Sequence, residues 1–192
     1  FSREWFLRLQ RSKQLDSYLV LGDQYLVTVD GSEYFNSESI SCSHCLTRHK
    51  SNDHIEHYHQ VLQPALVHPD HSQVIPLAPE FIRRQDGANK QDCEIGAGMR
   101  AVRRIRADHR QLPAIIVGDA LYSTTRFIAE LVEKRFSYIL GVKPASHKTL
   151  FQDVQGLRRG KMLDRLEGTR KDRSRLVYEW VHDTPLFATA EA

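Results

Sequence analysis

Two aspartates occupy positions where a carboxylate could bind a metal ion. Asp30 ends the β-branched and aromatic stretch 25–30, and Asp119 ends the apolar run 114–119. Ligands collect at the carboxyl ends of strands in open α/β sheets, so neighbouring strands would bring both carboxylates together. Carboxylate oxygens select Mg²⁺ or Mn²⁺, and two such ions can support phosphodiester chemistry. The alternative is that each aspartate only forms a turn beside glycine, and spacing alone favours this alternative.

A second group of residues has spacing that resembles a zinc site. Cys42 and Cys45 form a CxxC motif, and histidines follow at positions 49, 54, 57 and 59. Two Cys and two His ligands would satisfy a structural zinc ion. Only eight residues separate Cys45 from His54, which is not the spacing of a standard zinc finger. We therefore favour ordinary hairpin thiols, with His57 and His59 on one face of a strand.

Basic residues are concentrated in the second half of the chain. The 192 residues carry a formal net charge of +3, with 27 Lys and Arg against 24 Asp and Glu. Clustered basic side chains neutralise phosphates, which makes DNA a candidate partner. The alternative is a solvated helix face and a charged loop, and charge alone favours it. The candidate DNA-binding residues are Arg100, Arg103, Arg104, Arg158, Arg159, Lys161, Arg170, Lys171 and Arg173.

Hydrophobic periodicity predicts helices and strands in a mixed α/β order. Apolar residues that recur every three or four positions predict helices over 1–15, 91–110, about 124–132 and 150–157. Alternating, β-branched or continuous apolar stretches predict strands over 25–30, 37–48, 57–68, 74–77, 114–119, 136–142, 161–167 and 174–181. The polar residues 50–53 predict a hairpin turn, and Pro76 predicts an edge strand. The strand–helix–strand unit over 114–142 predicts parallel pairing.

Several classes of protein are excluded or disfavoured by the sequence. The apolar runs are too short to span a bilayer, no secretory signal pattern is present, and three cysteines favour a reducing compartment. No GxGxxG or GxxxxGK[ST] motif occurs, and Ser32, Ser123 and Thr124 have no adjacent His–Asp pattern. The chain lacks an initiator Met, so we expect a fragment of a longer protein. Among the other acids, Glu33 could support Asp30, and Glu94 lies near a helix start, where the dipole favours negative charge.

Several blocks, in order along the chain, resemble the bacterial insertion-sequence DDE transposases of the ISNCY type. The blocks are Tyr25–Phe35, His57–Leu62, Val67–Pro69, Val74–Leu77, the helix entry at 85–94, Val117–Tyr122 and Tyr138–Lys143. The resemblance covers about residues 20–145. It implies an α/β fold with an RNase H-like mixed sheet and flanking helices, followed by the start of a β-rich insertion. The expected divisions are an N-terminal helix at 1–18, a partial catalytic core at 19–148 and the insertion segment at 149–192.

The resemblance also implies metal-dependent DNA strand cleavage and strand transfer. It carries Asp30 and Asp119 over as the first two acidic residues of the catalytic triad, with Mg²⁺ or Mn²⁺ as cofactor. The third residue of the triad is a glutamate on a later helix, and no residue of this sequence matches it. We therefore expect this glutamate to lie beyond residue 192, and we expect this chain alone to be inactive. The resemblance implies that the full-length protein binds transposon-end DNA, target DNA and a second subunit, and that it does not bind a membrane. It also implies a location in the bacterial cytoplasm, at the nucleoid. The alternatives are another RNase H-like nuclease, or a non-catalytic DNA-binding or zinc-binding remnant of a mobile element.

Overall fold

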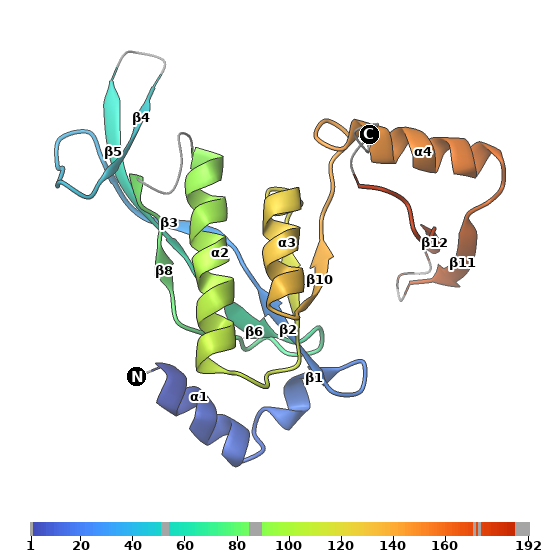
Figure 1. Ribbon diagram of the computed structural model, residues 1–192, viewed down its shortest axis with the longest axis horizontal. Helices are drawn as coiled ribbons and strands as arrows, with labels where there is room; N and C mark the ends of the chain where they lie inside the picture. Colours follow the sequence, from blue (N-terminus) through green and yellow to red (C-terminus); the bar gives the residue numbers. More distant parts are fainter. Residues whose placement is uncertain (1, 51–53, 85–89, 171, 173, 187–192) are drawn as a thin grey trace. The chain divides into compact units, whose positions relative to one another are not determined.

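The protein has a mixed α/β architecture, as the sequence predicts. The computed structural model describes residues 2–50, 54–84, 90–170, 172 and 174–186, and within them four α-helices accompany a mixed sheet and two smaller antiparallel sheets (Figure 1). Residues 51–53 of the predicted turn at 50–53 and residues 85–89 of the helix entry at 85–94 lie outside the described residues. Two compact units divide the chain, residues 1–141 and residues 142–192. None of the described helices is long and apolar enough to cross a membrane.

The mixed sheet of the first unit has β9 (Ala114–Gly118) near its centre. β9 pairs in parallel with β2 (Gln24–Thr28) on one side and with β10 (Ser137–Leu140) on the other. β6 (Ala65–Val67) lies antiparallel to β2, and β7 (Ile75–Pro76) forms the opposite edge, while β1 (Leu19–Val20) also pairs with β2. The strand order is β10-β9-β2-β6-β7. The predictions of a central strand at 114–119, parallel pairing with the next strand and an edge strand at Pro76 are confirmed.

Two helices, α2 (Lys90–Asp108) and α3 (Thr125–Glu133), contact each other in the first unit (Figure 1). The predicted face of α2 is buried, with Ile95, Met99, Val102 and Ile105 in the core. Thr124 caps α3 because its side chain accepts a hydrogen bond from the Phe127 amide. The apolar residues of this helix predict a buried stripe that includes Phe127, Leu131 and Val132; Phe127 and Leu131 are fully buried, but Val132 is 61% exposed, so the prediction was wrong for Val132. At the start of the chain, α1 (Ser2–Arg11) buries Phe6 in the same core.

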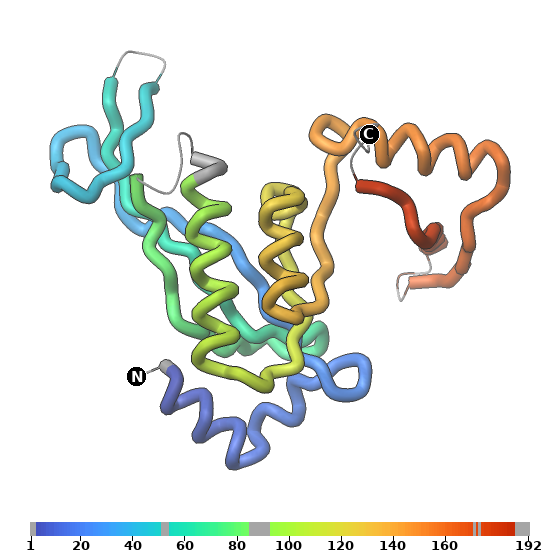
Figure 2. The backbone as a smooth tube through the Cα atoms, in the orientation of Figure 1, coloured from blue at the N-terminus to red at the C-terminus, as the bar shows by residue number. Residues whose placement is uncertain are grey.

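One long hairpin runs from the mixed sheet into a second, antiparallel sheet. Thr28 pairs with Ala65 in the first sheet, and Gly31 pairs with Leu62 in the second. The two chain segments therefore keep the same antiparallel register as they pass from one sheet into the other. The chain passes directly from β2 into β3 (Gly31–Ser37), as Figure 2 shows, and from β5 (Ile55–Leu62) into β6. The second sheet is completed by β4 (Leu46–His49) and β8 (Glu80–Phe81), which both pair with β5.

The prediction of the strands in this region was partly wrong. Gly31 begins a strand instead of ending one, and residues 38–45 form no strand between β3 and β4. The predicted strand at 57–68 is two strands in two sheets, because the chain changes sheets at Gln63 and Pro64. The hairpin of β4 and β5 around the polar residues 50–54 is confirmed.

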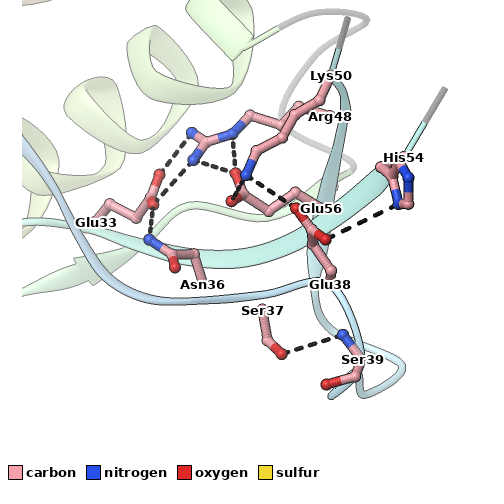
Figure 3. A network of polar contacts seen from close by, with 9 residues as sticks. All are labelled: Glu33, Asn36, Ser37, Glu38, Ser39, Arg48, Lys50, His54 and Glu56. Carbon is pink, nitrogen blue, oxygen red and sulfur yellow. Dashed lines mark hydrogen bonds and ion pairs between the residues drawn. The ribbon is translucent and has the colours of Figure 1, made fainter. Parts of the chain in front are cut away.

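A network of ion pairs connects the strands of the second sheet (Figure 3). Arg48 contacts both Glu33 and Glu56, and Lys50 contacts Glu56 at 2.7 Å and Glu38 at 3.2 Å. Glu56 is 5% exposed, so its charge requires these two cations. Their hydrogen bonds lower the pKa of Glu56, with Lys50 the larger cause. The network therefore fixes the register of β3, β4 and β5 through side chains as well as backbone.

The second unit contains one helix and one hairpin. α4 (Lys148–Arg159) is followed by β11 (Asp164–Thr169) and β12 (Arg175–Trp180), which pair antiparallel. This confirms the predicted helix and the predicted hairpin around the basic segment. Almost every side chain of the hairpin is exposed, in contrast to β2 and β9 of the mixed sheet.

Candidate metal-binding site at the sheet edge

Asp30 and Asp119 lie at the same level of the mixed sheet. Thr28 pairs with Val117, and the two aspartates each follow two residues later. The pairing continues past the last strand residue, since the Val29 amide donates to the Val117 carbonyl at 2.9 Å. Adjacent strands are about 4.8 Å apart, so the two aspartates follow neighbouring strands at the carboxyl edge of β2 and β9. The structure thus shows that the two strands are neighbours, while the convergence of the two carboxylates stays a prediction.

Both aspartates are exposed, and each folds back onto its own backbone. Oδ1 of Asp30 accepts the Gly31 amide at 2.9 Å, and Oδ1 of Asp119 accepts the Leu121 amide at 2.9 Å. These are the turn contacts of the alternative interpretation, and they also orient the carboxylates. Among the described residues, the second oxygen of each aspartate accepts no hydrogen bond from protein. Each carboxylate is therefore held in place with one oxygen available to a ligand.

A third acidic side chain, that of Glu94, packs close to Gly31, the residue after Asp30. Glu94 lies near the start of α2, as predicted, and it is 7% exposed. Its two oxygens accept hydrogen bonds from Gln60 Nε2 at 3.1 Å and from the Tyr122 hydroxyl at 3.1 Å. Gln60 and Tyr122 are themselves buried. These three residues form a buried polar group that the sequence analysis missed, because it depends on contact between β5, α2 and the turn after β9.

Gly31 and Tyr122 connect the buried polar group to the two aspartates. A Cβ atom at Gly31 would lie 2.6 Å from Gln60 Nε2 and 2.7 Å from the Glu94 carboxylate, so this group packs directly against the residue after Asp30. Burial, followed by the charge and hydrogen bond of Glu94 and then the charges of Asp30 and Asp119, raises the pKa of Tyr122. The Tyr122 hydroxyl is therefore a permanent donor, oriented by Glu94 in a strongly negative region.

Three potential metal ligands also converge in the second sheet. Cys42 Sγ and Cys45 Sγ each lie 3.4 Å from His59 Nε2, and the two sulfurs are 3.7 Å apart. Among the described residues, this is the one group in which at least three His, Cys, Asp or Glu ligand atoms lie within 4.8 Å of one another. The group can hold a metal ion. His57 lies on the same face of β5, as predicted, but it is not part of the group.

Neighbouring contacts position each member of this group. The Cys42 amide donates to Cys45 Sγ at 3.2 Å, and the Cys45 amide donates to the Cys42 carbonyl at 3.1 Å. Hydrogen bonding, first from the His44 backbone and then from Cys45, lowers the pKa of the Cys42 thiol. The His59 ring packs between Tyr34, at a centroid distance of 5.8 Å, and Phe35, at 5.5 Å.

The predicted DNA-binding arginines of α2 are engaged in contacts within the protein. Arg103 makes a bidentate pair with the buried carboxylate of Glu130, at 2.8 Å and 2.5 Å. Arg100 and Arg104 both contact Glu80 at 3.4 Å. These arginines therefore contribute to contacts within the protein, and their part in DNA binding stays a prediction. Glu33 likewise pairs with Arg48 and Asn36 in the second sheet.

The basic residues of the second unit differ in how they are engaged. Arg158 pairs with Glu179 at 2.6 Å. Arg159, Lys161 and Arg170 are exposed, and they form no ion pair among the described residues. Lys171 and Arg173 lie outside the described residues. The exposed cations of this unit are therefore more available to phosphate than those of α2.

Comparison with known proteins leaves the family open. A comparison with models of known protein families gives no match, and a comparison with the sequences of characterised proteins gives none.

Proposed function

We propose that this chain is part of a DDE-type transposase and belongs to the domain that cuts and joins DNA. The observation that carries the proposal is the position of Asp30 and Asp119, level with each other after two paired parallel strands. The resemblance of the sequence blocks assigns these same two residues to the acidic triad. Two independent arguments, one from motifs and one from strand register, therefore select the same pair.

The strand order supports an RNase H-like core. Such a core has three antiparallel strands followed by two parallel ones, with acidic residues on the first and fourth. Here β2, β6 and β7 are the antiparallel set, and β9 and β10 are the parallel pair added beside β2. Asp30 follows the first of these strands and Asp119 follows the fourth. The hairpin extension into the second sheet is larger than a minimal ribonuclease requires, which favours the transposase over the other nucleases.

The residues at this edge fit a hard divalent cation. Both donors are carboxylates, both are exposed, and each is oriented by an amide that binds one oxygen. Magnesium or manganese ions bound there would supply a Lewis acid that activates water and stabilises the leaving oxygen of a phosphodiester. Three ligand atoms are not brought within 4.8 Å of one another here, so we expect weak binding by this chain without nucleic acid.

The other residues of the site hold the surroundings of the two aspartates in place or supply positive charge for DNA. Tyr122 and Gln60 hold Glu94 in a fixed position under the aspartates, which limits movement of the Gly31 backbone. The exposed cations Arg159, Lys161 and Arg170 would neutralise DNA phosphates without reading sequence. The proposal includes that the full-length protein acts as a dimer on paired transposon ends and on target DNA.

The direct test is Mn²⁺ binding by isothermal calorimetry. We expect binding by this chain, and loss of binding in both Asp30→Ala and Asp119→Ala. Asp70→Ala removes an exposed carboxylate elsewhere in the same unit and serves as the control, with unchanged binding expected. Circular dichroism verifies that each variant is folded.

The outcomes separate the proposal from its alternatives. Binding that survives both substitutions would place the metal elsewhere and would remove the assignment of these aspartates. No Mn²⁺ binding by the folded parent, together with stoichiometric zinc, would favour a non-catalytic remnant of a mobile element.

A further inference from the structure

The CxxC turn before β4 and the middle of β5 meet at a point that a metal ion would fill. Leu46 pairs with Tyr58, so Cys45 and His59 are the next opposed positions of the same two strands. Cys42 is brought beside them by the turn that the Cys45 amide closes on the Cys42 carbonyl. Strand register and turn geometry therefore select one histidine among those that follow the motif.

The distances among the three ligand atoms match a tetrahedral zinc ion. With Zn–S about 2.3 Å and Zn–N about 2.0–2.1 Å, a tetrahedron separates two sulfurs by about 3.8 Å and a sulfur from a nitrogen by about 3.6 Å. The structure has 3.7 Å between the sulfurs and 3.4 Å from each sulfur to His59 Nε2. A disulfide would instead require a sulfur–sulfur distance of about 2.05 Å, and both cysteines are free thiols.

We propose that Cys42, Cys45 and His59 bind one Zn²⁺ ion, at a site separate from Asp30 and Asp119. Two soft thiolates and an imidazole in tetrahedral array select zinc over Mg²⁺ or Mn²⁺. Among the described residues, no fourth His, Cys, Asp or Glu joins the group, and we assign the fourth coordination position to water as part of the proposal. The ion ties the turn at 42–45 to β5, and its role is to hold together the end of the second sheet.

The surroundings of the site are those of a supported metal centre. Cys45 is 1% exposed, and Arg84 Nε donates to its carbonyl at 2.7 Å. His59 is held between two aromatic rings and forms one wall of a pocket of about 460 Å³, which His44 and Arg84 also line. Because Cys42 is exposed, solvent reaches the group directly.

The test is metal content and Co²⁺ spectroscopy on the whole chain in a thiol-free reducing buffer. We expect about one zinc per chain by elemental analysis, and Co²⁺ to give the thiolate charge-transfer and visible bands of a tetrahedral centre. Loss of an outer-shell partner alone costs about 10- to 100-fold in metal affinity, so loss of a ligand should cost at least about 100-fold. That loss is expected for Cys42→Ser, Cys45→Ser and His59→Asn.

Two variants provide matched controls. Cys93→Ser removes the remaining cysteine, which lies on α2, and His57→Asn removes a histidine two residues away on the same face of β5. Both should bind Co²⁺ as the parent does. Chelation should lower the melting temperature of the parent and leave that of Cys42→Ser, whose altered side chain is exposed, unchanged.

A folded, reduced parent that takes up neither zinc nor Co²⁺ would overturn the proposal, as would equal losses in the ligand and control variants. The result does not depend on the proposed transposase function. Mn²⁺ binding at the two aspartates is measured separately, and either site can fail without the other.

Discussion

Asp30 and Asp119 are level with each other across two parallel strands, and each has one carboxylate oxygen that no described protein group occupies. Two anions at this spacing repel each other in the absence of a cation. We therefore expect Asp30→Asn or Asp119→Asn to stabilise the metal-free protein by up to about 1 kcal/mol. The measurement is urea unfolding in EDTA, with Asp70→Asn as the control.

In the presence of Mn²⁺, the parent should become more stable than the Asp30→Asn and Asp119→Asn variants. A cation that binds only the folded state adds stability to the parent and little to the variants. If the parent and both Asn variants were equally stable in EDTA, the two carboxylates would be too far apart to share an ion.

Gly31 separates Asp30 from the buried Gln60 and Glu94, with no space for a side chain. An added Cβ would lie 2.6–2.7 Å from these two side chains, and both are buried. Overpacking of this kind costs about 1–3 kcal/mol, and we expect Gly31→Ala to lower the free energy of unfolding by that amount. Gly168→Ala is the control, because a Cβ there meets nothing within 4 Å. Equal stability of the two variants in urea unfolding would show that the polar group can move aside.

Much of the mixed sheet was predictable from the sequence. The run Ala114–Gly118 is continuously apolar because successive side chains of β9 point to opposite faces of the sheet and are buried or half-buried on both, and Pro76 marks the edge because it cannot donate in a ladder. Asp30 and Asp119 were found because strand ends are recognisable without knowing the pairing. That the two aspartates follow neighbouring strands at the same height along the sheet could be known only from the register of β2 and β9, which the structure shows.

The remaining features depend on contacts between distant segments. Gly31 resembled a strand end, yet it starts β3, because one hairpin keeps its register across the bend at Asp30 and Gln63. Glu94 was predicted only to lie near a helix start, and its contacts with Gln60 and Tyr122, which the sequence does not reveal, accompany its burial. Similarly, the CxxC motif was visible, but the choice of His59 over His57 follows from the pairing of β4 with β5.

Tyr122 should contribute to stability through its hydroxyl. Tyr122→Phe leaves one buried oxygen of Glu94 without its donor, and an unsatisfied buried acceptor costs about 1–3 kcal/mol. Since Tyr138 is 41% exposed and its hydroxyl forms no hydrogen bond among the described residues, Tyr138→Phe should change stability by less than about 0.5 kcal/mol. Thermal unfolding of the two variants compares them directly, and a Tyr122→Phe melting curve that overlays the parent would contradict the hydrogen bond.

Glu130 should give the protein a pH-dependent contribution to stability. Hydrogen bonds from Arg103 lower the pKa of Glu130 below its unfolded value of about 4.3. The stabilisation is therefore complete above about pH 4.3 and is lost as the pH falls through the lower folded value. Because Arg103 is half exposed, we expect a deficit of about 1 kcal/mol for Glu130→Gln at neutral pH.

Urea unfolding at several pH values measures this contribution. The difference between the parent and Glu130→Gln should shrink below about pH 4.3. Glu133→Gln, with a side chain 68% exposed, should show almost no difference at any pH. A deficit for Glu130→Gln that stays constant into acid would mean that its ionisation is not linked to folding.

The two groups of arginines should differ in their contribution to DNA binding. Arg159 and Arg170 are exposed without ion pairs among the described residues, whereas Arg100 and Arg104 are paired with Glu80. Each phosphate contact contributes about −0.9 to the slope of log affinity against log salt concentration. The double variant Arg159→Ser and Arg170→Ser should therefore reduce the magnitude of the slope by up to about 1.8. Arg100→Ser with Arg104→Ser removes the same charge and should leave the slope nearly unchanged.

Fluorescence anisotropy with a duplex DNA at several salt concentrations measures both slopes, after circular dichroism has verified folding. Equal reductions in the two variants would indicate that net charge alone attracts DNA. A reduction confined to Arg100 and Arg104 would place the DNA on α2, and the ion pairs with Glu80 would then have to open on binding. A reduction confined to the variant of Arg159 and Arg170 would support the proposal that the exposed cations of the second unit bind DNA phosphates, since ion pairing within the protein keeps the α2 cations from phosphate.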